Sequence, residues 1–334
     1  MIAAGTPNGF RVVDSFNRSV RLGEGLRASG RLAEESMKRA LDALRICAER
    51  MKQWPLVHVR AVATEACRQA ANGREFLARV QHETGLAIDI ITAREEAELA
   101  LESCSPLFRQ TEQRTISADR GVLFDIGGGS TEVAWVRIDP ERQTQTLIGT
   151  TSIPVGVITL QEMFGEGHGA SYEVMLRHVQ DYLTGFENVH RIRREVTLGK
   201  TRLIGTSGTV TTLAGVALSL PRYNRSVIDG LTLPGPSMID AIGSLRGLDR
   251  DQLSDHPCVG AERSRFVLAG CAIFEAIHRL WPVENVTIAD RGLRDGMLLR
   301  MARDHGQRSL KGRHATSRHS TPRSRGPYGT YATI

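Results

Sequence analysis

Apolar and polar positions alternate with a period that changes along the chain, and each change predicts a different element. Residues 121–125 (GVLFD) form a short apolar run typical of a buried strand, and residues 131–138 continue with a second strand pattern. A polar turn then leads into a third such run at 146–156. These three runs predict an antiparallel meander, and residues 1–26 repeat the pattern of its last two strands.

Helical and strand patterns alternate after each meander. Apolar residues at positions 37, 41, 44, 48 and 51 recur every three or four residues, which places them on one face of a helix. Asn72 and Glu75 have the spacing of a capping box, and they predict a helix that ends at Gly85. Further strands are expected at 56–63, 86–91, 202–206 and 285–289, and further helices at 64–73, 94–103, 172–187, 209–218, 262–281 and 293–303.

Three antiparallel strands followed by alternating helices and strands, present twice, predict a duplicated α/β fold with mixed sheets and a cleft between two domains. We expect a first domain at 1–118, a second domain at 119–303 and a tail at 304–334. The residues after His305 include six basic side chains and no acidic one, and they are rich in Gly, Ser, Thr and Pro. This composition is typical of a disordered basic tail.

The composition narrows the class of protein. Six of the 43 Lys and Arg residues lie in the tail, so 37 basic residues face 37 acidic ones in the rest of the chain, and no specific nucleic-acid partner is expected. No apolar run approaches the ~20 residues of a membrane helix, and the first residues lack the pattern of a signal peptide. The five cysteines and ten histidines show no zinc-ligand spacing. We therefore expect a cytoplasmic protein with no membrane partner.

A glycine loop separates the first two strands of the second meander. Gly127, Gly128 and Gly129 are followed by Ser130 and then directly by a strand, whereas a P-loop or a dinucleotide-binding loop would lead into a helix. Glycines allow backbone N–H groups to approach phosphate oxygens, and a hydroxyl adds a donor. Asp125 at the strand end has the chemistry to hold a cation. The alternative interpretation is a tight turn without a ligand, because glycine is also a common turn residue.

Several motifs together resemble one known family. They are FRVVDSF, AVATEACRQAANG, EEA at 95–97, FDIGGGSTEV, GTSGTVTTLAG and ADRGLRDGML. Taken in this order, they resemble the exopolyphosphatase and guanosine pentaphosphate phosphohydrolase (Ppx/GppA) family of the actin-like ATPase superfamily. The resemblance extends over 1–300 and implies duplicated actin-like (RNase H-like) domains.

The resemblance also implies roles for particular residues. Glu96 matches the catalytic glutamate that activates the attacking water, and Arg68 matches an arginine that contacts phosphate. Asp125 and Glu132 match the carboxylates that hold Mg²⁺. The other matches are phosphate-binding positions in two glycine-rich loops, namely Gly127, Gly128, Gly129, Ser130, Gly205, Ser207, Gly208 and Thr209.

The activity implied by the resemblance is hydrolysis of phosphoanhydrides. Terminal phosphate would be released from inorganic polyphosphate or from guanosine pentaphosphate (pppGpp) by Mg²⁺-dependent, glutamate-assisted attack of water. Such a reaction needs charge stabilisation and a positioned water more than covalent chemistry. One alternative is a catalytically impaired family member that binds polyphosphate or nucleotide, and another is an actin-like sugar or acetate kinase, which the EEA and ADRGLRDGML segments disfavour. We also consider a homodimer.

One departure from the family pattern concerns the first strand. The family's N-terminal phosphate loop, which lies on that strand, has no counterpart here, because residues 1–5 match the strand after it. A sheet without this strand would expose the edge of its neighbour, which favours aggregation. The hypothesis is that the coding frame extends upstream of Met1 and that the chain as it stands is poorly soluble or nearly inactive. Glu98 also stands where the family often has arginine.

Overall fold

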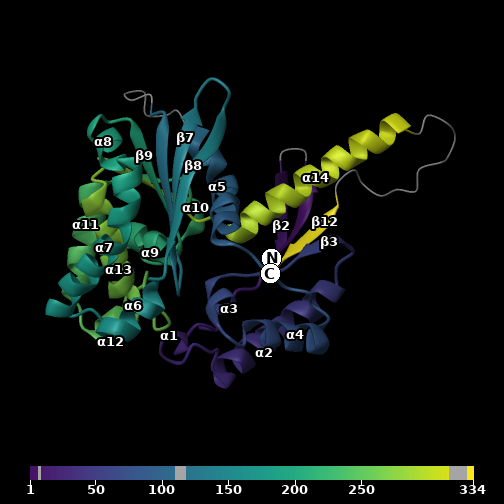
Figure 1. Cartoon of the computed structure of the whole chain (residues 1–334), viewed down its shortest axis with the longest axis horizontal. Coiled ribbons are helices and arrows are strands. Elements are labelled where there is room, and N and C mark those ends of the chain that lie inside the picture. Colours follow the sequence, from purple (N-terminus) through teal and green to yellow (C-terminus); the bar gives the residue numbers. More distant parts are fainter. Residues whose placement is uncertain (7–8, 110–117, 316–328) are drawn as a thin grey trace. The chain divides into compact units, whose positions relative to one another are not determined.

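The computed structural model describes residues 1–6, 9–109, 118–315 and 329–334, and these residues form two compact units (Figure 1). Unit 1 consists of Met1–Thr92 and Leu293–Ile334, and unit 2 consists of Ala93–Gly292. None of the helices in these ranges is long and apolar enough to cross a membrane. The predicted meanders and the α/β alternation after each of them are confirmed.

Unit 2 is built on a six-stranded mixed sheet with the strand order β10-β11-β9-β6-β7-β8. The central strand β6 pairs antiparallel with β7 and parallel with β9. Strand β11 continues the parallel part beside β9, and β8 pairs antiparallel with β7. The strands are β6 (Arg120–Ile126), β7 (Thr131–Asp139), β8 (Thr144–Ile153), β9 (Thr201–Thr206), β10 (Thr232–Pro234) and β11 (Asn285–Ala289).

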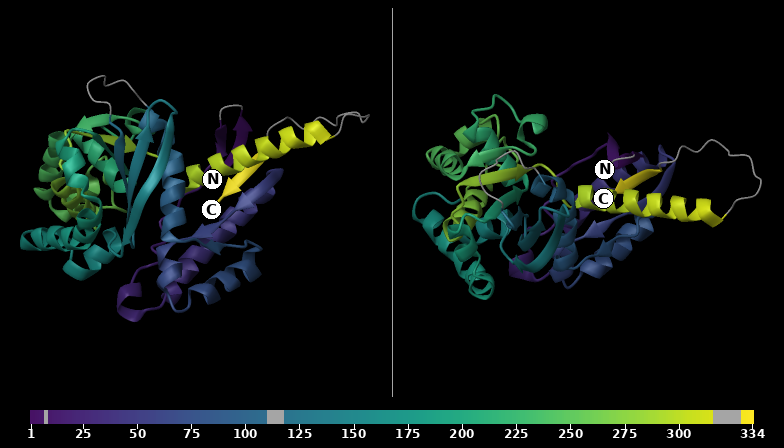
Figure 2. Two further views of the ribbon diagram at one scale, coloured as in Figure 1. Left: turned by 45° about the horizontal axis from the view of Figure 1, so that its top comes forward. Right: turned by 90° about the horizontal axis from the view of Figure 1, so that it is seen from above.

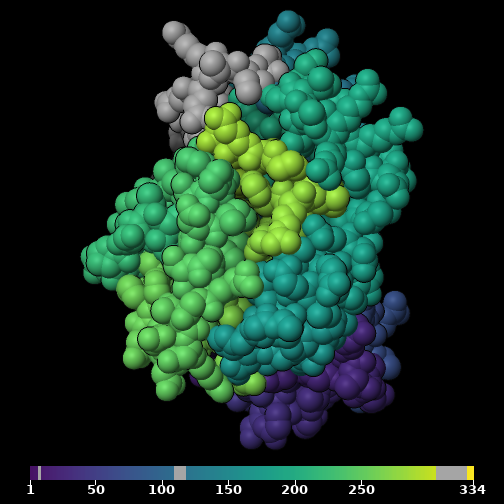
Figure 3. All heavy atoms as spheres, turned by 90° about the vertical axis from the view of Figure 1, so that its left-hand side faces the viewer, coloured from purple at the N-terminus to yellow at the C-terminus, as the bar shows by residue number. Residues whose placement is uncertain are grey.

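Helices cover both faces of this sheet (Figure 1). One face packs against α5 (Ala93–Arg109), and the other packs against a group of helices that includes α7, α9 and α13. Figure 3 looks onto the side formed by this second group, where teal and green segments make up most of the visible surface. Besides α5, the helices of unit 2 are α6 (Val157–Phe164), α7 (Ala170–His190), α8 (Ile192–Thr197), α9 (Gly208–Ala217), α10 (Arg225–Ile228), α11 (Gly235–Arg246), α12 (Arg250–Asp255) and α13 (Val267–Leu280).

Unit 1 contains a four-stranded sheet with the order β2-β1-β12-β3 and a small parallel pair, β4 with β5. Helix α14 packs on the four-stranded sheet, where Leu298 and Met301 share a buried cluster with Ala3 and Tyr331. The strands are β1 (Ile2–Thr6), β2 (Gly9–Asp14), β3 (Leu56–Arg60), β4 (Val62–Ala63), β5 (Asp89–Ile90) and β12 (Thr330–Thr333), and the helices are α1 (Leu26–Ser29), α2 (Glu34–Lys52), α3 (Glu65–Gln69), α4 (Gly73–Thr84) and α14 (Leu293–Ala315).

The division between the units differs from the predicted boundaries at 118 and 303. The reason is that the sheet of each unit packs against a helix that the order of the chain had assigned to the other predicted domain. The buried face of α5 includes Ala97, Ala100 and Cys104, and it packs on the sheet of unit 2, although α5 follows the strands of unit 1 along the chain. Helix α14 follows the strands of unit 2 and packs in unit 1.

The tail is also ordered where the structure describes it, so the prediction of a disordered segment over all of 304–334 is wrong. Helix α14 extends to Ala315, residues 316–328 lie outside the described part, and residues 330–333 form β12. Tyr331, Ala332 and Thr333 are at most 1% exposed. The basic and polar composition of the whole tail concealed this short segment, whose Tyr and Thr residues favour strands.

Strand β12 occupies the position beside β1 that was expected to be an exposed edge. It pairs antiparallel with β1 and parallel with β3. The ammonium group of Met1 donates to the carbonyl oxygen of Thr333 at 2.7 Å, and the N–H of Thr333 donates to the carbonyl oxygen of Met1 at 2.9 Å. The two ends of the chain therefore lie side by side (Figures 1 and 2), and the expected exposed edge of β1 is absent.

The four strands β2-β1-β12-β3 repeat part of the sheet of unit 2. There the order β8-β7-β6-β9 has the same directions, with an antiparallel pair on one side of the central strand and a parallel pair on the other. Strand β12 thus corresponds to β6. This internal correspondence bears out the predicted duplicated α/β fold with mixed sheets.

One local prediction is wrong. Asn72 precedes α4, but its side chain makes no capping hydrogen bond to that helix. The carboxamide instead accepts from the N–H of Leu32 at 2.8 Å and donates to the carbonyl oxygen of Leu32 at 3.1 Å. The tertiary contact satisfies both backbone groups of a buried residue, which a capping bond at the surface would not. Gly85 does end α4 with a left-handed conformation, φ 73°.

Candidate active site

Four polar residues form one row across the sheet of unit 2, near the carboxyl end of β6. Asp125 on β6 lies opposite Glu132 on β7 and opposite Thr206 on β9. Glu132 in turn lies opposite Ser152 on β8. Paired residues on neighbouring strands point to the same face, so Thr206, Asp125, Glu132 and Ser152 form a polar row. Ligands commonly bind at the carboxyl ends of strands in such sheets.

The two carboxylates in the polar row have different surroundings. Glu132 is 5% exposed, and its Oε1 accepts hydrogen bonds from the hydroxyls of Ser130 at 2.6 Å and Ser152 at 2.8 Å. For Asp125, burial raises the pKa from 3.8 to about 7, and the negative charge of Glu132 acts in the same direction. A carboxyl group with so high a pKa is a place where a cation would be favourable.

The glycine loop at 127–130 is fastened to the helix that follows the meander. The N–H of Gly127 closes the loop on the carbonyl oxygen of Ser130 at 2.9 Å. The carbonyl oxygens of Gly127 and Gly128 accept from the first N–H groups of α6, at Val157 and Ile158. Within the described ranges, the N–H groups of Gly128 and Gly129 have no acceptor. The loop therefore uses its carbonyls internally and retains two donors for a ligand.

Glu96 lies at the same end of the sheet as the polar row. Phe108 near the end of α5 is next to Gly121 at the start of β6, because a Cβ on Gly121 would be 2.4 Å from the Phe108 ring. Glu96 lies about 18 Å before Phe108 along α5. Asp125 lies about 13 Å after Gly121 along β6. Leu123, two residues before Asp125, belongs to the cluster that packs on α5. Glu96 and Asp125 are therefore on the same side of the sheet, near its carboxyl end.

The second glycine-rich loop follows β9, the parallel neighbour of β6. Ser207 has φ 121°, a conformation that a non-glycine residue rarely adopts. Its hydroxyl oxygen accepts from the N–H of Val210 at 3.4 Å and so caps α9. Gly208 is exposed, Thr209 is half-buried, and Gly205 is buried. Because Asp125 pairs with Thr206, this strained loop starts one residue beyond the polar row.

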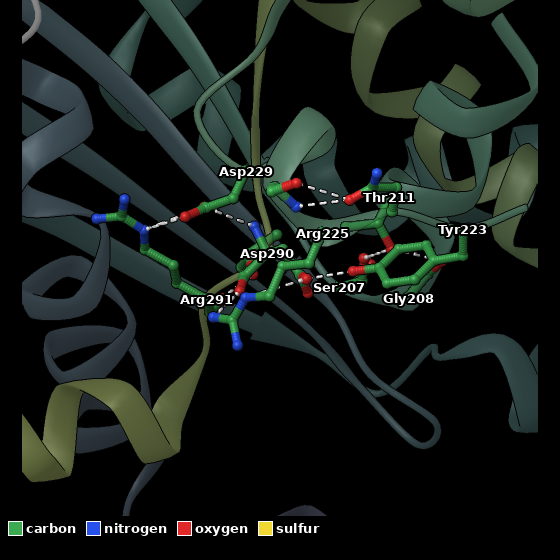
Figure 4. Close-up of polar contacts among 11 residues, drawn as sticks. Ser207, Gly208, Thr211, Tyr223, Arg225, Asp229, Asp290 and Arg291 are labelled. Atoms are coloured by element: carbon green, nitrogen blue, oxygen red, sulfur yellow. Dashed lines mark hydrogen bonds and ion pairs between the residues drawn. The ribbon is translucent and has the colours of Figure 1, made fainter. Parts of the chain in front are cut away.

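A cluster of charged residues that the sequence analysis did not assign supports this second loop (Figure 4). Arg291 donates through Nε to both carboxylate oxygens of Asp229, at 3.0 and 2.9 Å, and Asp229 accepts from the N–H of Asp290 at 3.1 Å. The carbonyl oxygen of Arg291 accepts from the hydroxyl of Thr206. Asp290 also pairs with Arg225. The sequence could have indicated Asp290 and Arg291, because they directly follow the strand predicted at 285–289.

Arg68 belongs to unit 1. Its guanidinium donates to the carboxylate of Glu65 through Nε at 3.0 Å and to the carbonyl oxygen of Ile91 through Nη1 at 2.7 Å. These bonds fix the side chain at the end of α3. Glu96, Asp125, Glu132 and the two loops therefore lie in unit 2, and Arg68 lies in unit 1. The roles assigned to all of these residues stay predictions.

Comparison with known proteins gives a consistent result. Residues 1–305 match the Ppx/GppA phosphatase family. The chain is 31% identical over 303 residues to the guanosine-5'-triphosphate,3'-diphosphate pyrophosphatase of Aeromonas salmonicida (strain A449), which covers 86% of this chain and 54% of that protein. It is 27% identical over 309 residues to the protein of the same name from Photobacterium profundum, with 90% and 56% covered. The chain thus spans about half the length of these relatives.

Solved structures share the fold. An exopolyphosphatase-like protein superposes with a TM-score of 0.80 at 23% identity, covering 90% of this chain and 93% of that one. The Ppx/GppA family member of Aquifex aeolicus gives 0.69 at 23% identity, with 90% and 92% covered. An exopolyphosphatase from Cytophaga hutchinsonii ATCC 33406 gives 0.78 at 21% identity, with 90% and 93% covered. With the sequence match, this establishes that the chain belongs to the Ppx/GppA phosphatase family.

Proposed function

We propose that the chain is a phosphohydrolase that releases terminal phosphate from inorganic polyphosphate or from pppGpp. One observation supports this function: Asp125 and Glu132 pair on the two strands that the first glycine loop joins, and Asp125 also pairs with Thr206, directly before the second loop. The first loop offers the N–H donors of Gly128 and Gly129, and the second begins at Ser207 beside the row. Donors and carboxylates at one strand end suit a phosphate chain and its counter-ion.

In this mechanism the first loop binds phosphate oxygens through the backbone N–H groups of Gly128 and Gly129, while the hydroxyl of Ser130 donates to Glu132. Ser207, Gly208 and Thr209 provide the second set of phosphate contacts at the start of α9. Glu96 accepts a proton from the attacking water, for which its position near the end of β6 is suitable. Hydrolysis of a phosphoanhydride depends mainly on positioning and charge stabilisation, so no covalent intermediate with the protein is required.

Mg²⁺ fits the chemistry of the two carboxylates. Asp125 and Glu132 are adjacent on neighbouring strands, and burial beside Glu132 raises the pKa of Asp125. Mg²⁺ is usually held by one or two protein carboxylates together with phosphate oxygens and water. When bound, the ion would neutralise charge on the phosphate chain. Asp125 and Glu132 would hold it, and the loops would orient the phosphates beside it.

The decisive test is phosphate release from three substrates by the full chain. Release from tripolyphosphate, long-chain polyphosphate or pppGpp with Mg²⁺ is expected, without phosphate transfer from ATP to a sugar or to acetate. Transfer from ATP would overturn the proposal in favour of a kinase. Tight binding of polyphosphate or pppGpp with no release would favour the impaired relative instead.

Gly156 provides a test of the first loop. A Cβ at Gly156 would lie 2.4 Å from the carbonyl carbon of Gly128 and 2.6 Å from the carbonyl oxygen of Gly127. Gly156→Ala should therefore push the loop away and weaken tripolyphosphate binding ~10-fold, equivalent to about 1.4 kcal/mol. Gly185→Ala on α7 is the matched control, because nothing lies within 4 Å of its Cβ. Equal binding by the two variants, measured by calorimetry, would remove the loop from the site.

Asp125 should make stability depend on pH in the absence of divalent cations. Folding raises its pKa from 3.8 to about 7, so the folded protein retains a proton that the unfolded chain has released between these values. Stability therefore falls as pH rises from about 4 to about 7. Asp125→Asn should raise the unfolding free energy at about pH 8 by on the order of 2–4 kcal/mol and leave it nearly unchanged at about pH 4.

Denaturant unfolding at the two pH values, with a chelator present, measures this effect of Asp125. Adding Mg²⁺ should reverse the ranking at the higher pH, because only the wild type keeps both carboxylates for the ion. A gain of the same size at both pH values would show that the titration of Asp125 is not its cause.

A further inference from the structure

Two serine hydroxyls from separate parts of the chain meet on one oxygen of Glu132. Ser130 lies in the glycine loop and Ser152 lies near the end of β8, and both donate to Oε1, at 2.6 and 2.8 Å. Ser130 has a role implied by the family resemblance, whereas Ser152 has none. The contact of Ser152 is not incidental, because β7 and β8 place Ser152 directly opposite Glu132.

The burial of this group makes the two hydrogen bonds energetically significant. Glu132 is 5% exposed and Ser130 is 4% exposed. A buried carboxylate without donors would have a large desolvation cost, and hydrogen bonds to a charged group are stronger than those between neutral groups. Two donors on the same oxygen also restrict rotation of the carboxylate, so the direction of the second oxygen is set by the protein.

The fixed orientation of the Glu132 carboxylate matters because of the place of Glu132 in the polar row. Glu132 stands between Ser152 on one neighbouring strand and Asp125 on the other. Side chains directly opposite on adjacent strands are about 5 Å apart at Cβ, so the charge of Glu132 is held close to Asp125.

From this geometry we infer that Ser152 is a positioning residue, which acts with Ser130 to orient Glu132 for cation binding at the phosphate site. The inference rests on the proposed function, because it requires that Asp125 and Glu132 hold the cation. Ser152 does not itself contact the cation or the substrate. Residues that orient a metal ligand typically change metal affinity or activity 10- to 100-fold when they are removed.

The experiment measures Mg²⁺ binding to the full chain by calorimetry, without substrate, and then kcat and KM for tripolyphosphate. Ser152→Ala should weaken Mg²⁺ binding ~10-fold. Ser152→Thr keeps the hydroxyl and should restore most of the affinity. Ser244→Ala is the control, because Ser244 makes a comparable hydroxyl contact, to the carbonyl oxygen of Asp240 at 3.1 Å, at an exposed position on α11.

Glu132→Gln separates failure of the inference from failure of the proposed function. If Glu132→Gln weakens Mg²⁺ binding but Ser152→Ala binds like the wild type, Ser152 is not a positioning residue and the proposed cation site stands. If Glu132→Gln also binds like the wild type, the cation site and the inference both fail. If Ser152→Thr is as weak as Ser152→Ala while both melt like the wild type, packing rather than the hydroxyl matters, and the inference is overturned.

Discussion

Replacing Glu96 by Gln is expected to lower kcat for phosphate release ~10²- to 10⁴-fold, the usual contribution of a general base. The carboxamide is nearly the same size but cannot accept a proton from water at neutral pH. Glu96 lies on the first turn of α5, near the carboxyl end of β6 and on the same side of the sheet as Asp125. The affinity for tripolyphosphate should change little, because the loops that bind phosphate remain intact.

Glu98 supplies the control for Glu96, since it lies on the same helix two residues later. Its carboxylate forms an ion pair with Arg94 at 3.0 Å, one helical turn away. Glu98→Gln removes that exposed pair, which is worth little, and should leave kcat within about twofold of the wild type. A Glu96→Gln enzyme that keeps more than about a tenth of the wild-type kcat would contradict the role of Glu96 as the base.

Replacing Thr333 by Pro is expected to destabilise the four-stranded sheet of unit 1. Thr333 is fully buried in β12, and its N–H donates to the carbonyl oxygen of Met1 at 2.9 Å. Proline removes this donor in the interior of a sheet, where proline is rarely tolerated. The lost bond alone should cost ~1–3 kcal/mol. Hydrogen exchange of the amides of β1 and β3 should become faster than in the wild type.

Thr333→Val is the matched variant for this experiment. The hydroxyl of Thr333 is buried and has no hydrogen-bond partner within the described residues. Valine has the same shape, keeps the backbone N–H and removes the unsatisfied hydroxyl, so it should match or exceed the wild type in melting temperature. If Thr333→Pro melts like Thr333→Val, β12 is not an integral strand of the sheet.

The sequence was sufficient for many of the elements but not for their partners, and it did not indicate β12 within the basic tail. Periodicity and turn residues identified the meander around 121–156 because alternation and glycine act locally. They could not identify which sheet α5 covers, because an amphipathic face at 97–108 is compatible with either unit. The boundaries predicted at 118 and 303 followed the order of the chain, whereas the buried faces of α5 and α14 determine the actual division at 92 and 292.

The candidate site shows the same limit. The glycine loop and Asp125 could be singled out because three consecutive glycines after an acidic strand end form a local pattern. Ser152 and Asp229 carried no local signal, since a serine in a strand and an aspartate after a short helix are common. Their importance comes from long-range pairing, β7 with β8 for Ser152 and Arg291 with Asp229. Such pairing depends on register, which composition and spacing do not determine.

Because the two chain ends pair with each other, the strand order in unit 1 would be the same if the termini lay at another point of the chain. Strands β6 and β7 are joined by four residues, 127–130, whereas β12 and β1 have the same relation with no covalent link between them. A loop of similar length from Ile334 to Met1, with the chain reopened between 315 and 329, would preserve every strand neighbour. Such a circular permutant should fold, because closing adjacent ends costs little entropy. In this permutant β12 would precede β1 along the chain, just as β6 precedes β7.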